Sequence, residues 1–319
     1  MTVILLLVGL SLIVLGAQWL VDGSSAIARK AGVSEFVIGL TIVGFGTSCP
    51  ELVVSMTGAL QGNADIAIGN VVGSNIFNIL FILGLTTMIM PISMTKNNRS
   101  RDIPITLLVT LIYIALSMNK SLFGLGNADS ISRIDGIVFL LLFALYLYYC
   151  FKFDSKEPLE EKIEPSKIKK LPVAILLVII GLSGLIFGGH IFVQAAIDLA
   201  KELGVSDKFI AITILAGGTS LPELATSIVA AAKHKDQLAL GNILGSNVFN
   251  ILFILGCSSV VTPLGMGGMT NVDAIALVAS AALLLLWAYS GKKCRIDRWE
   301  GIVMLLCLAG YYSYLFTKL

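Results

Sequence analysis

Two glutamates occupy matched positions inside long apolar segments of this chain. Each belongs to a seven-residue motif, Gly-Thr-Ser-x-Pro-Glu-Leu, which occurs at 46–52 and again at 218–224. If these segments cross a bilayer, each carboxylate costs roughly 2.5–3.5 kcal/mol on insertion scales. The same acid beside the same proline in both copies therefore indicates a shared partner. The carboxylate and hydroxyl oxygens of the motif favour a cation in that role.

The proline of the motif indicates how ligands could be assembled. Pro50 has no N–H to donate to the carbonyl of Gly46, and its ring crowds that carbonyl, so the helix is expected to kink or unwind there. Thr47 and Ser48 precede Glu51 by four and three residues, which places both hydroxyls on the face of the carboxylate. The candidate ligands from the two copies of this motif are Thr47, Ser48, Glu51, Thr219, Ser220 and Glu223.

A second motif, Gly-Asn-x-x-Gly-Ser-Asn-x-x-Asn, follows each glutamate segment, at 69–78 and at 241–250. Its two glycines have the four-residue spacing that is typical of close helix packing. Its serine and its last asparagine are also four residues apart, so they project from one helical face as oxygen ligands. We interpret the glycines as structural and assign ligation to Ser74, Asn78, Ser246 and Asn250.

A structural alternative exists for the two glutamates. Each could be a buried acid that is satisfied by neighbouring hydroxyls, or held protonated, and that locks helices together. The repetition of acid and proline in both copies is better explained by a common site.

Composition places the chain among membrane proteins with several spans. Hydrophobic residues make up 56% of its 319 residues and charged residues 13%, with a mean hydropathy of +0.92. A net charge of +2, with basic residues dispersed among short loops, does not indicate nucleic-acid binding. His190 and His234 have no Cys or His at ligand spacing, so neither a transition metal nor a cofactor is expected. The partners expected are ions and the lipid bilayer, with no obligate protein partner evident.

The predicted fold is all-α, with ten transmembrane helices. A span needs roughly 20 apolar residues. The ten predicted spans are 2–30, 34–60, 64–90, 102–118, 131–151, 172–202, 206–232, 237–262, 271–290 and 297–317. The polar segment 152–171 is interpreted as a cytoplasmic linker between two domains of five spans each, 1–151 and 172–319.

The two domains are predicted to be inverted repeats. At an offset of 172 residues, the stretch 69–84 matches 241–256 at 13 of 16 positions. Because each repeat has an odd number of spans, the second copy has the opposite orientation in the membrane. Inverted repeats place the substrate site near the midplane, where the broken helices of both copies meet.

Loop charges predict the orientation. Of the 22 Lys and Arg residues, 17 lie on the side of the linker, which the positive-inside rule makes cytoplasmic. Both termini are therefore expected outside the cytoplasm, in a multi-pass protein of the cell membrane.

The paired motifs, the ten spans and the inverted halves resemble the calcium/cation antiporter superfamily, specifically prokaryotic sodium/calcium exchangers. The resemblance covers the whole transmembrane chain. It implies a central diamond of sites in which the ten residues assigned above bind calcium and sodium. It further implies that backbone carbonyls near Gly44 and Ala216 contribute, and that the first and sixth spans slide as a gate.

The resemblance also implies a transport activity, not an enzymatic one. The chain is expected to exchange more than two sodium ions for each calcium ion, which makes transport electrogenic. Asn250 lies where potassium-transporting relatives typically have Asp, so potassium independence is expected. Cys49 is a second departure, at a position where an aliphatic residue is commoner.

Three other function classes are weighed against this one. A proton/calcium exchanger of the same architecture would use the same carboxylates and would follow a pH gradient without sodium. A cation channel would show symmetry between subunits, whereas this symmetry is internal. A membrane enzyme would need a nucleophile and a base, and the spans have no His or Cys near the glutamates that suits these roles.

Overall fold

The computed structural model describes residues 2–124, 128–153, 170–203, 216–266, 268–290 and 294–318. Most of these residues are helical, as the composition predicts. The α-helices are α1 (Thr2–Ala31), α2 (Glu35–Ile38), α3 (Gly44–Thr47), α4 (Cys49–Leu60), α5 (Ala64–Phe77), α6 (Gly84–Ile89), α7 (Ile103–Ser117), α8 (Asn119–Phe123), α9 (Arg133–Lys152), α10 (Leu171–Glu202), α12 (Ala216–Gly218), α13 (Leu221–Ala232), α14 (Asp236–Val248), α15 (Leu255–Val261), α16 (Asn271–Ser290) and α17 (Arg298–Lys318).

Four π-helical segments in the described part of the chain interrupt or extend these helices. They are η1 (Gly39–Val43), η2 (Asn78–Leu83), η3 (Asn98–Asp102) and η6 (Phe249–Ile254). A π-helical turn widens the helix locally and is frequent at functional sites. Two of them, η2 and η6, begin at or next to an asparagine assigned above as a ligand.

Eight helical segments in the described part of the chain are long and apolar enough to cross a membrane. The count is nine if the bent pair Glu35–Thr47 and Cys49–Leu60 forms one span. These segments agree with nine predicted spans to within a few residues. The remaining predicted span, 206–232, is described only from 216 onward and includes the short apolar helix α13. The number ten therefore stays a prediction.

The predicted break at the proline motif is confirmed. Helix α3 ends at Thr47 and α4 begins at Cys49, with Ser48 between them at φ −86° and ψ 9°. In the second copy, Ser220 has nearly the same backbone angles, φ −88° and ψ 8°, immediately before α13. The proline follows the start of each new helix, where its missing N–H costs no intrahelical hydrogen bond.

The described chain divides into two compact units, and each is treated by itself. The first unit contains 1–48 and 150–245, and the second contains 49–149 and 246–319. Each unit thus combines helices from both predicted sequence domains, 1–151 and 172–319.

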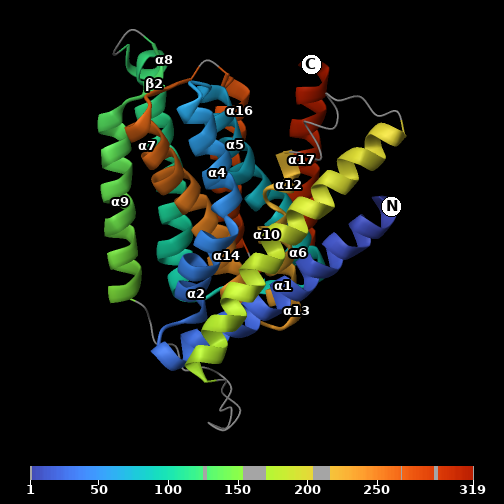
Figure 1. The fold of residues 1–319 in the computed structure, drawn as a ribbon. Helices are drawn as coiled ribbons and strands as arrows, with labels where there is room; N and C mark the ends of the chain where they lie inside the picture. The colour runs from blue at the N-terminus through green and yellow to red at the C-terminus, as the bar shows by residue number, and fades with distance from the viewer. Residues whose placement is uncertain are drawn as a thin grey trace. The chain divides into compact units, whose positions relative to one another are not determined.

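In the first unit, α1 and α10 pack along their lengths as an antiparallel pair (Figure 1). A Cβ added at Gly9 would lie 2.8 Å from the nitrogen of Phe192, and one added at Gly23 would lie 2.7 Å from the carbonyl oxygen of Ala174. Small residues therefore let the two backbones approach closely, as is common in membrane helix pairs.

The glycines of α14 also have the predicted packing role. A Cβ at Gly245 would lie 2.6 Å from the Cα of Leu40 in η1, and one at Gly241 would lie even closer to the carbonyl oxygen of Phe36 in α2. For Gly69 and Gly73 in the first copy, no described residue lies within 4 Å of the added atom. The repeat equivalent of Leu40 falls outside the described residues, so the packing role of these two glycines stays a prediction.

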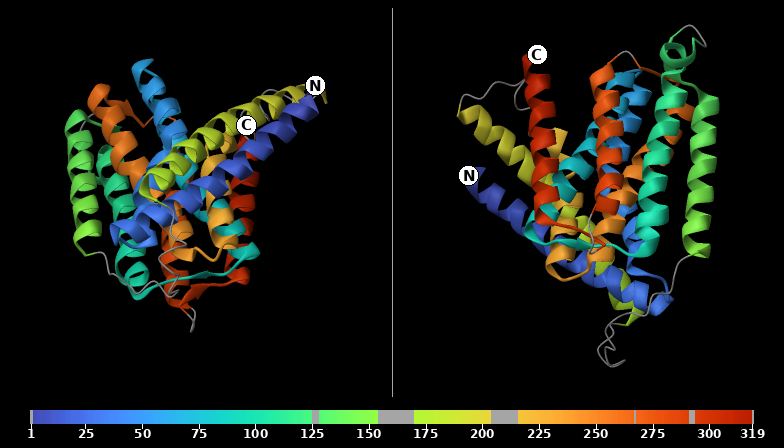
Figure 2. Two further views of the ribbon diagram at one scale, coloured as in Figure 1. Left: turned by 60° about the horizontal axis from the view of Figure 1, so that its bottom comes forward. Right: turned by 180° about the vertical axis from the view of Figure 1, so that it is seen from behind.

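In the second unit, two strand pairs join distant segments, which the sequence pattern did not predict. Strand β1 (Ile92–Ser93) pairs antiparallel with β4 (Arg295–Ile296), and β2 (Ser130–Ile131) pairs antiparallel with β3 (Leu264–Gly265). Figure 2 shows the first of these pairs beneath the ends of the helices. Each pair joins a segment of the first sequence domain to one of the second.

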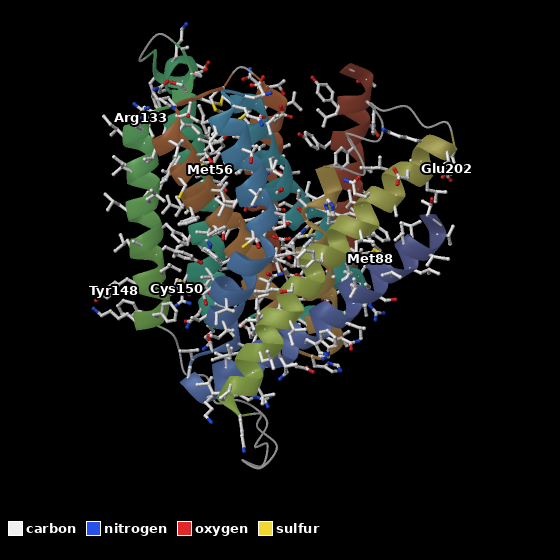
Figure 3. The ribbon with its side chains drawn as sticks, in the orientation of Figure 1. Met56, Met88, Arg133, Tyr148, Cys150 and Glu202 are labelled. Carbon is white, nitrogen blue, oxygen red and sulfur yellow. The ribbon has the colours of Figure 1, made fainter. Side chains whose placement is uncertain are left out.

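Helix α9 has the surface of a membrane span. Its apolar side chains Ile134, Leu141 and Leu145 are 73%, 65% and 61% exposed. The labelled side chains in Figure 3 place Arg133 near one end of this helix and Tyr148 near the other. Charged and aromatic residues at the two ends of an exposed apolar helix are typical of a segment that crosses a bilayer.

Candidate cation-binding residues

In the first unit, a buried hydroxyl and a buried carboxylate from opposite halves of the sequence meet. Ser48 follows α3, and Glu223 lies in the first turn of α13. The Ser48 hydroxyl donates a hydrogen bond of 2.7 Å to Oε1 of Glu223, and both residues are at most 1% exposed. The positive end of the α13 dipole favours a negative charge at this position. This contact brings together two of the predicted ligands.

Asn242 connects the same region to two further side chains. Its Nδ2 donates to the carbonyl oxygen of Glu223 at 3.3 Å and to the hydroxyl of Ser227 at 3.0 Å. Its Oδ1 accepts a hydrogen bond of 3.1 Å from the hydroxyl of Thr47. The side-chain amide of Asn242 in α14 therefore contacts both α13 and a predicted ligand, Thr47.

The second unit contains a matching arrangement around Glu51. Asn70 donates from Nδ2 to the carbonyl oxygen of Glu51 at 3.1 Å and to the hydroxyl of Ser55 at 2.9 Å. Glu51 is 1% exposed and lies in the first turn of α4, where the helix dipole again favours its charge. Each residue of this set lies 172 positions before its counterpart around Glu223.

The predicted amide ligands lie in the second unit. Asn78 opens η2 and is 1% exposed, and Asn250 lies in η6 with no exposed surface. Each donates from Nδ2 to another asparagine, Asn78 to Asn247 and Asn250 to Asn75. The predicted hydroxyl ligands Ser74 and Ser246 are buried near them along the chain, at 4% and 0% exposure.

The remaining predicted ligands lie in the first unit. The carbonyl oxygen of Gly44 accepts a hydrogen bond of 3.1 Å from the nitrogen of Ser48 and a 3.5 Å contact from the hydroxyl of Thr47. The carbonyl oxygen of Gly44 therefore already accepts hydrogen bonds from within the chain. Ala216 opens α12, and only its backbone is described. The hydroxyl of Thr219 is buried and has no hydrogen-bond partner among the described residues.

Sequence reasoning missed four asparagines that connect these residues: Asn70, Asn75, Asn242 and Asn247. All four belong to the repeated second motif, and each is identical in both copies. That identity was the available signal. The motif predicts roles for its glycines, its serine and its last asparagine, but it does not by itself predict one for its first two asparagines.

The candidate ligands have the chemistry that a hard cation prefers. Its described side chains offer carboxylate, hydroxyl and amide oxygens, and calcium prefers oxygen ligands of this kind. Both acids are buried, so an uncompensated charge on either would be costly in a low-dielectric interior.

Comparison with known proteins agrees with this chemistry. The sodium/calcium exchanger protein family matches residues 1–152 and 173–317. The sodium/calcium exchanger MaX1 of Methanosarcina acetivorans is 32% identical over 98% of this chain and 98% of its own length. The inner membrane protein YrbG of Escherichia coli K12 is 34% identical over 91% of this chain and 90% of its own.

A solved structure supports the same relationship. The sodium-calcium exchanger NCX_Mj, soaked with zero Na⁺ and Ca²⁺, matches with a TM-score of 0.84 and 37% identity, covering 98% of each chain. The protein is a cation antiporter of the membrane, and it belongs to the sodium/calcium exchanger protein family.

Proposed function

We propose that this protein exchanges sodium ions for calcium ions across the cell membrane by alternating access. The observation that carries the proposal is the burial of two acids, Glu51 and Glu223, among oxygen donors from the repeated motifs. The family and the name of the relative MaX1 support both ions as substrates.

Charge balance provides the coupling rule. Two ionised glutamates carry two negative charges, which one calcium ion or at least two sodium ions neutralise. An occupied site avoids most of the cost of a buried charge, whereas an empty site retains it. The conformational change is therefore favoured with either ion bound and disfavoured with none, which makes exchange obligatory.

The proposed ligands are those that the two motifs predict. They are Thr47, Ser48, Glu51, Ser74, Asn78, Thr219, Ser220, Glu223, Ser246 and Asn250, with backbone carbonyls of Gly44 and Ala216. The repeat of the motif is the basis for assigning both sets to one transported ion. The matching hydrogen bonds around Glu51 and Glu223 support equivalent roles for the two acids.

We also propose ten spans in two inverted repeats, 1–151 and 172–319, joined by the cytoplasmic linker 152–171. The antiparallel packing of α1 and α10, which occupy equivalent places in the two repeats, supports opposite orientations. The excess of basic residues in loops on one side supports extracytoplasmic termini in a prokaryotic plasma membrane.

Transport is proposed to be electrogenic and independent of potassium. The first property follows if more than two sodium ions exchange for one calcium ion. The second follows from the neutral amides at Asn78 and Asn250, which provide oxygen ligands without adding a third negative charge.

The test is calcium uptake into sealed proteoliposomes that contain the purified protein. Vesicles loaded with sodium should take up calcium when diluted into sodium-free medium, and should not when sodium is equal on both sides. A third set of vesicles has a pH gradient and no sodium. Uptake driven by the pH gradient alone would instead identify a proton/calcium exchanger that uses the same carboxylates.

A further inference from the structure

Four buried asparagines form a cluster in the second unit. Asn75 lies in α5 and Asn78 at the start of η2, and their repeat equivalents Asn247 and Asn250 lie in α14 and η6. None of the four is more than 2% exposed. We call these residues the amide cluster. The proposed function uses only two of its members, Asn78 and Asn250, as ligands.

The hydrogen bonds of the amide cluster are reciprocal between the two repeats. Asn78 donates from Nδ2 to Oδ1 of Asn247 at 3.0 Å, and Asn250 donates from Nδ2 to Oδ1 of Asn75 at 3.1 Å. Asn75 also donates from Nδ2 to the carbonyl oxygen of Asn247 at 3.3 Å. Each candidate ligand thus directs its NH₂ group toward an asparagine of the other repeat.

The consequence of this arrangement is seen at the amide oxygens. Oδ1 of Asn78 and Oδ1 of Asn250 are both buried, and neither accepts a hydrogen bond from any described residue. A buried polar atom without a partner costs about 1–3 kcal/mol, so such atoms are rare and call for an explanation. A cation that these oxygens coordinate would compensate the cost.

We propose that Asn75 and Asn247 are positioning residues for the transported cation. Each accepts the NH₂ group of a ligand amide and so fixes which end of that amide is available to the ion. The inference rests on the proposed function, because it takes Asn78 and Asn250 as cation ligands.

The physical reason lies in the symmetry of the amide group. A rotation of the Asn78 amide by 180° exchanges its oxygen and its NH₂ group with almost no change in shape. The oxygen is a ligand for calcium, whereas the NH₂ group is a donor only and repels a cation. Oδ1 of Asn247 disfavours the rotated form, because rotation would place two oxygens against each other. Outer partners of this kind typically contribute 10- to 100-fold to metal affinity.

A purely structural role for the cluster makes a different prediction. If Asn247 only joined helices, its loss would weaken calcium binding equally whatever residue 78 is. If Asn247 orients an amide, its loss should matter only when residue 78 has two unlike ends. A carboxylate at residue 78 has two equivalent oxygens and needs no orientation.

The experiment is a double-mutant cycle of four purified proteins: native, Asn247→Leu, Asn78→Asp and the double variant. The dissociation constant for calcium is measured by isothermal titration in detergent, which requires no sodium coupling. Asn247→Leu should raise this constant by about 10- to 100-fold in the native background. The same substitution should raise it by less than about threefold when residue 78 is Asp.

The reciprocal pair supplies a second cycle, with Asn75→Leu and Asn250→Asp, if a variant of the first does not fold. Asn98→Leu is the matched control, because Asn98 is a buried amide whose side-chain partners among the described residues are Thr95 and Asp102, just before α7. It should lower thermal stability and leave the dissociation constant unchanged.

The outcomes separate this inference from the proposed function. Equal losses of affinity in both backgrounds, or an unchanged dissociation constant for Asn247→Leu, would overturn the positioning role and leave the exchanger intact. Native protein that binds no calcium would overturn the proposed function and the inference together.

Discussion

The hydroxyl of Ser48 donates a hydrogen bond of 2.7 Å to the carboxylate of Glu223, although the two residues are 175 positions apart in the chain. Both side chains are buried, and each belongs to a different copy of the same motif. A charge-assisted hydrogen bond of this length is among the stronger polar contacts in proteins. The contact links the break after α3 to the acid at the start of α13.

Ser48→Ala should weaken calcium transport because it removes both a proposed ligand and a donor to Glu223. A hydrogen bond to a charged group contributes about 1.5–3 kcal/mol, so the KM for calcium should rise at least about tenfold. Initial rates of sodium-dependent calcium uptake provide the measurement. Ser313→Ala is the control, because the Ser313 hydroxyl is exposed and, among the described residues, donates to the carbonyl oxygen of Ala309 in its own helix. An unchanged KM in Ser48→Ala would contradict the assignment.

Asn70→Leu and Asn242→Leu should destabilise the protein by similar amounts. Each asparagine donates to a glutamate carbonyl and to a serine hydroxyl, in the same pattern. Loss of the donor removes two buried hydrogen bonds, each of which contributes about 0.5–1.5 kcal/mol. Thermal unfolding in detergent should show lower midpoints for both variants. A normal midpoint for either would mean that its hydrogen bonds are replaced by others.

The break before the proline and the positions of most spans could be predicted because they follow from local covalent and length rules. A proline cannot donate an N–H, and a span needs about 20 apolar residues. The positions of Thr47, Ser48 and Glu223 as buried polar residues followed from the repeated motif.

The partners of the asparagines could not be predicted in the same way. The spacing of Asn75 and Asn78 on one helix indicates a face, but it does not indicate that each pairs with an asparagine of the other repeat. The π-helical turn that begins at Asn78 has no distinctive composition. Strands of two residues, such as Ile92–Ser93, are too short to produce an alternating pattern and depend on pairing with a distant segment.

Transport should not require potassium. Asn250 is a neutral amide, so the proposed ligands include two formal negative charges, enough for one calcium ion without an additional monovalent cation. Sodium-dependent calcium uptake is measured in potassium-free and in potassium-containing media, with choline as the replacement and the membrane potential clamped. Equal rates are expected. Loss of uptake on removal of potassium from both sides would show that the interpretation of Asn250 is wrong.

Exchange should respond to membrane potential, because unequal charges move in the two directions. Each elementary charge translocated corresponds to about 2.3 kcal/mol per 100 mV. In sodium-loaded vesicles, more positive charge leaves with sodium than enters with calcium. A potassium diffusion potential set with valinomycin, inside positive, should therefore speed the initial uptake of calcium. Initial uptake that is the same at all imposed potentials would indicate electroneutral exchange.

Glu51→Gln and Glu223→Gln should each abolish calcium transport and leave a folded protein. Removal of one charge leaves the calcium-loaded state with a net positive charge in a low-dielectric interior, which costs several kcal/mol. Size-exclusion chromatography and thermal unfolding check the fold of each variant. Glu202→Gln, at the exposed end of α10 (Figure 3), is the matched control and should transport normally.

The most direct measurement is the initial rate of calcium uptake into sodium-loaded proteoliposomes, for the native protein and for Glu51→Gln and Glu223→Gln side by side. The native protein should take up calcium only when sodium is lower outside than inside, and neither variant should exceed protein-free vesicles. Sodium-driven uptake at the native rate by either variant would contradict the account, as would native uptake that ignores the sodium gradient.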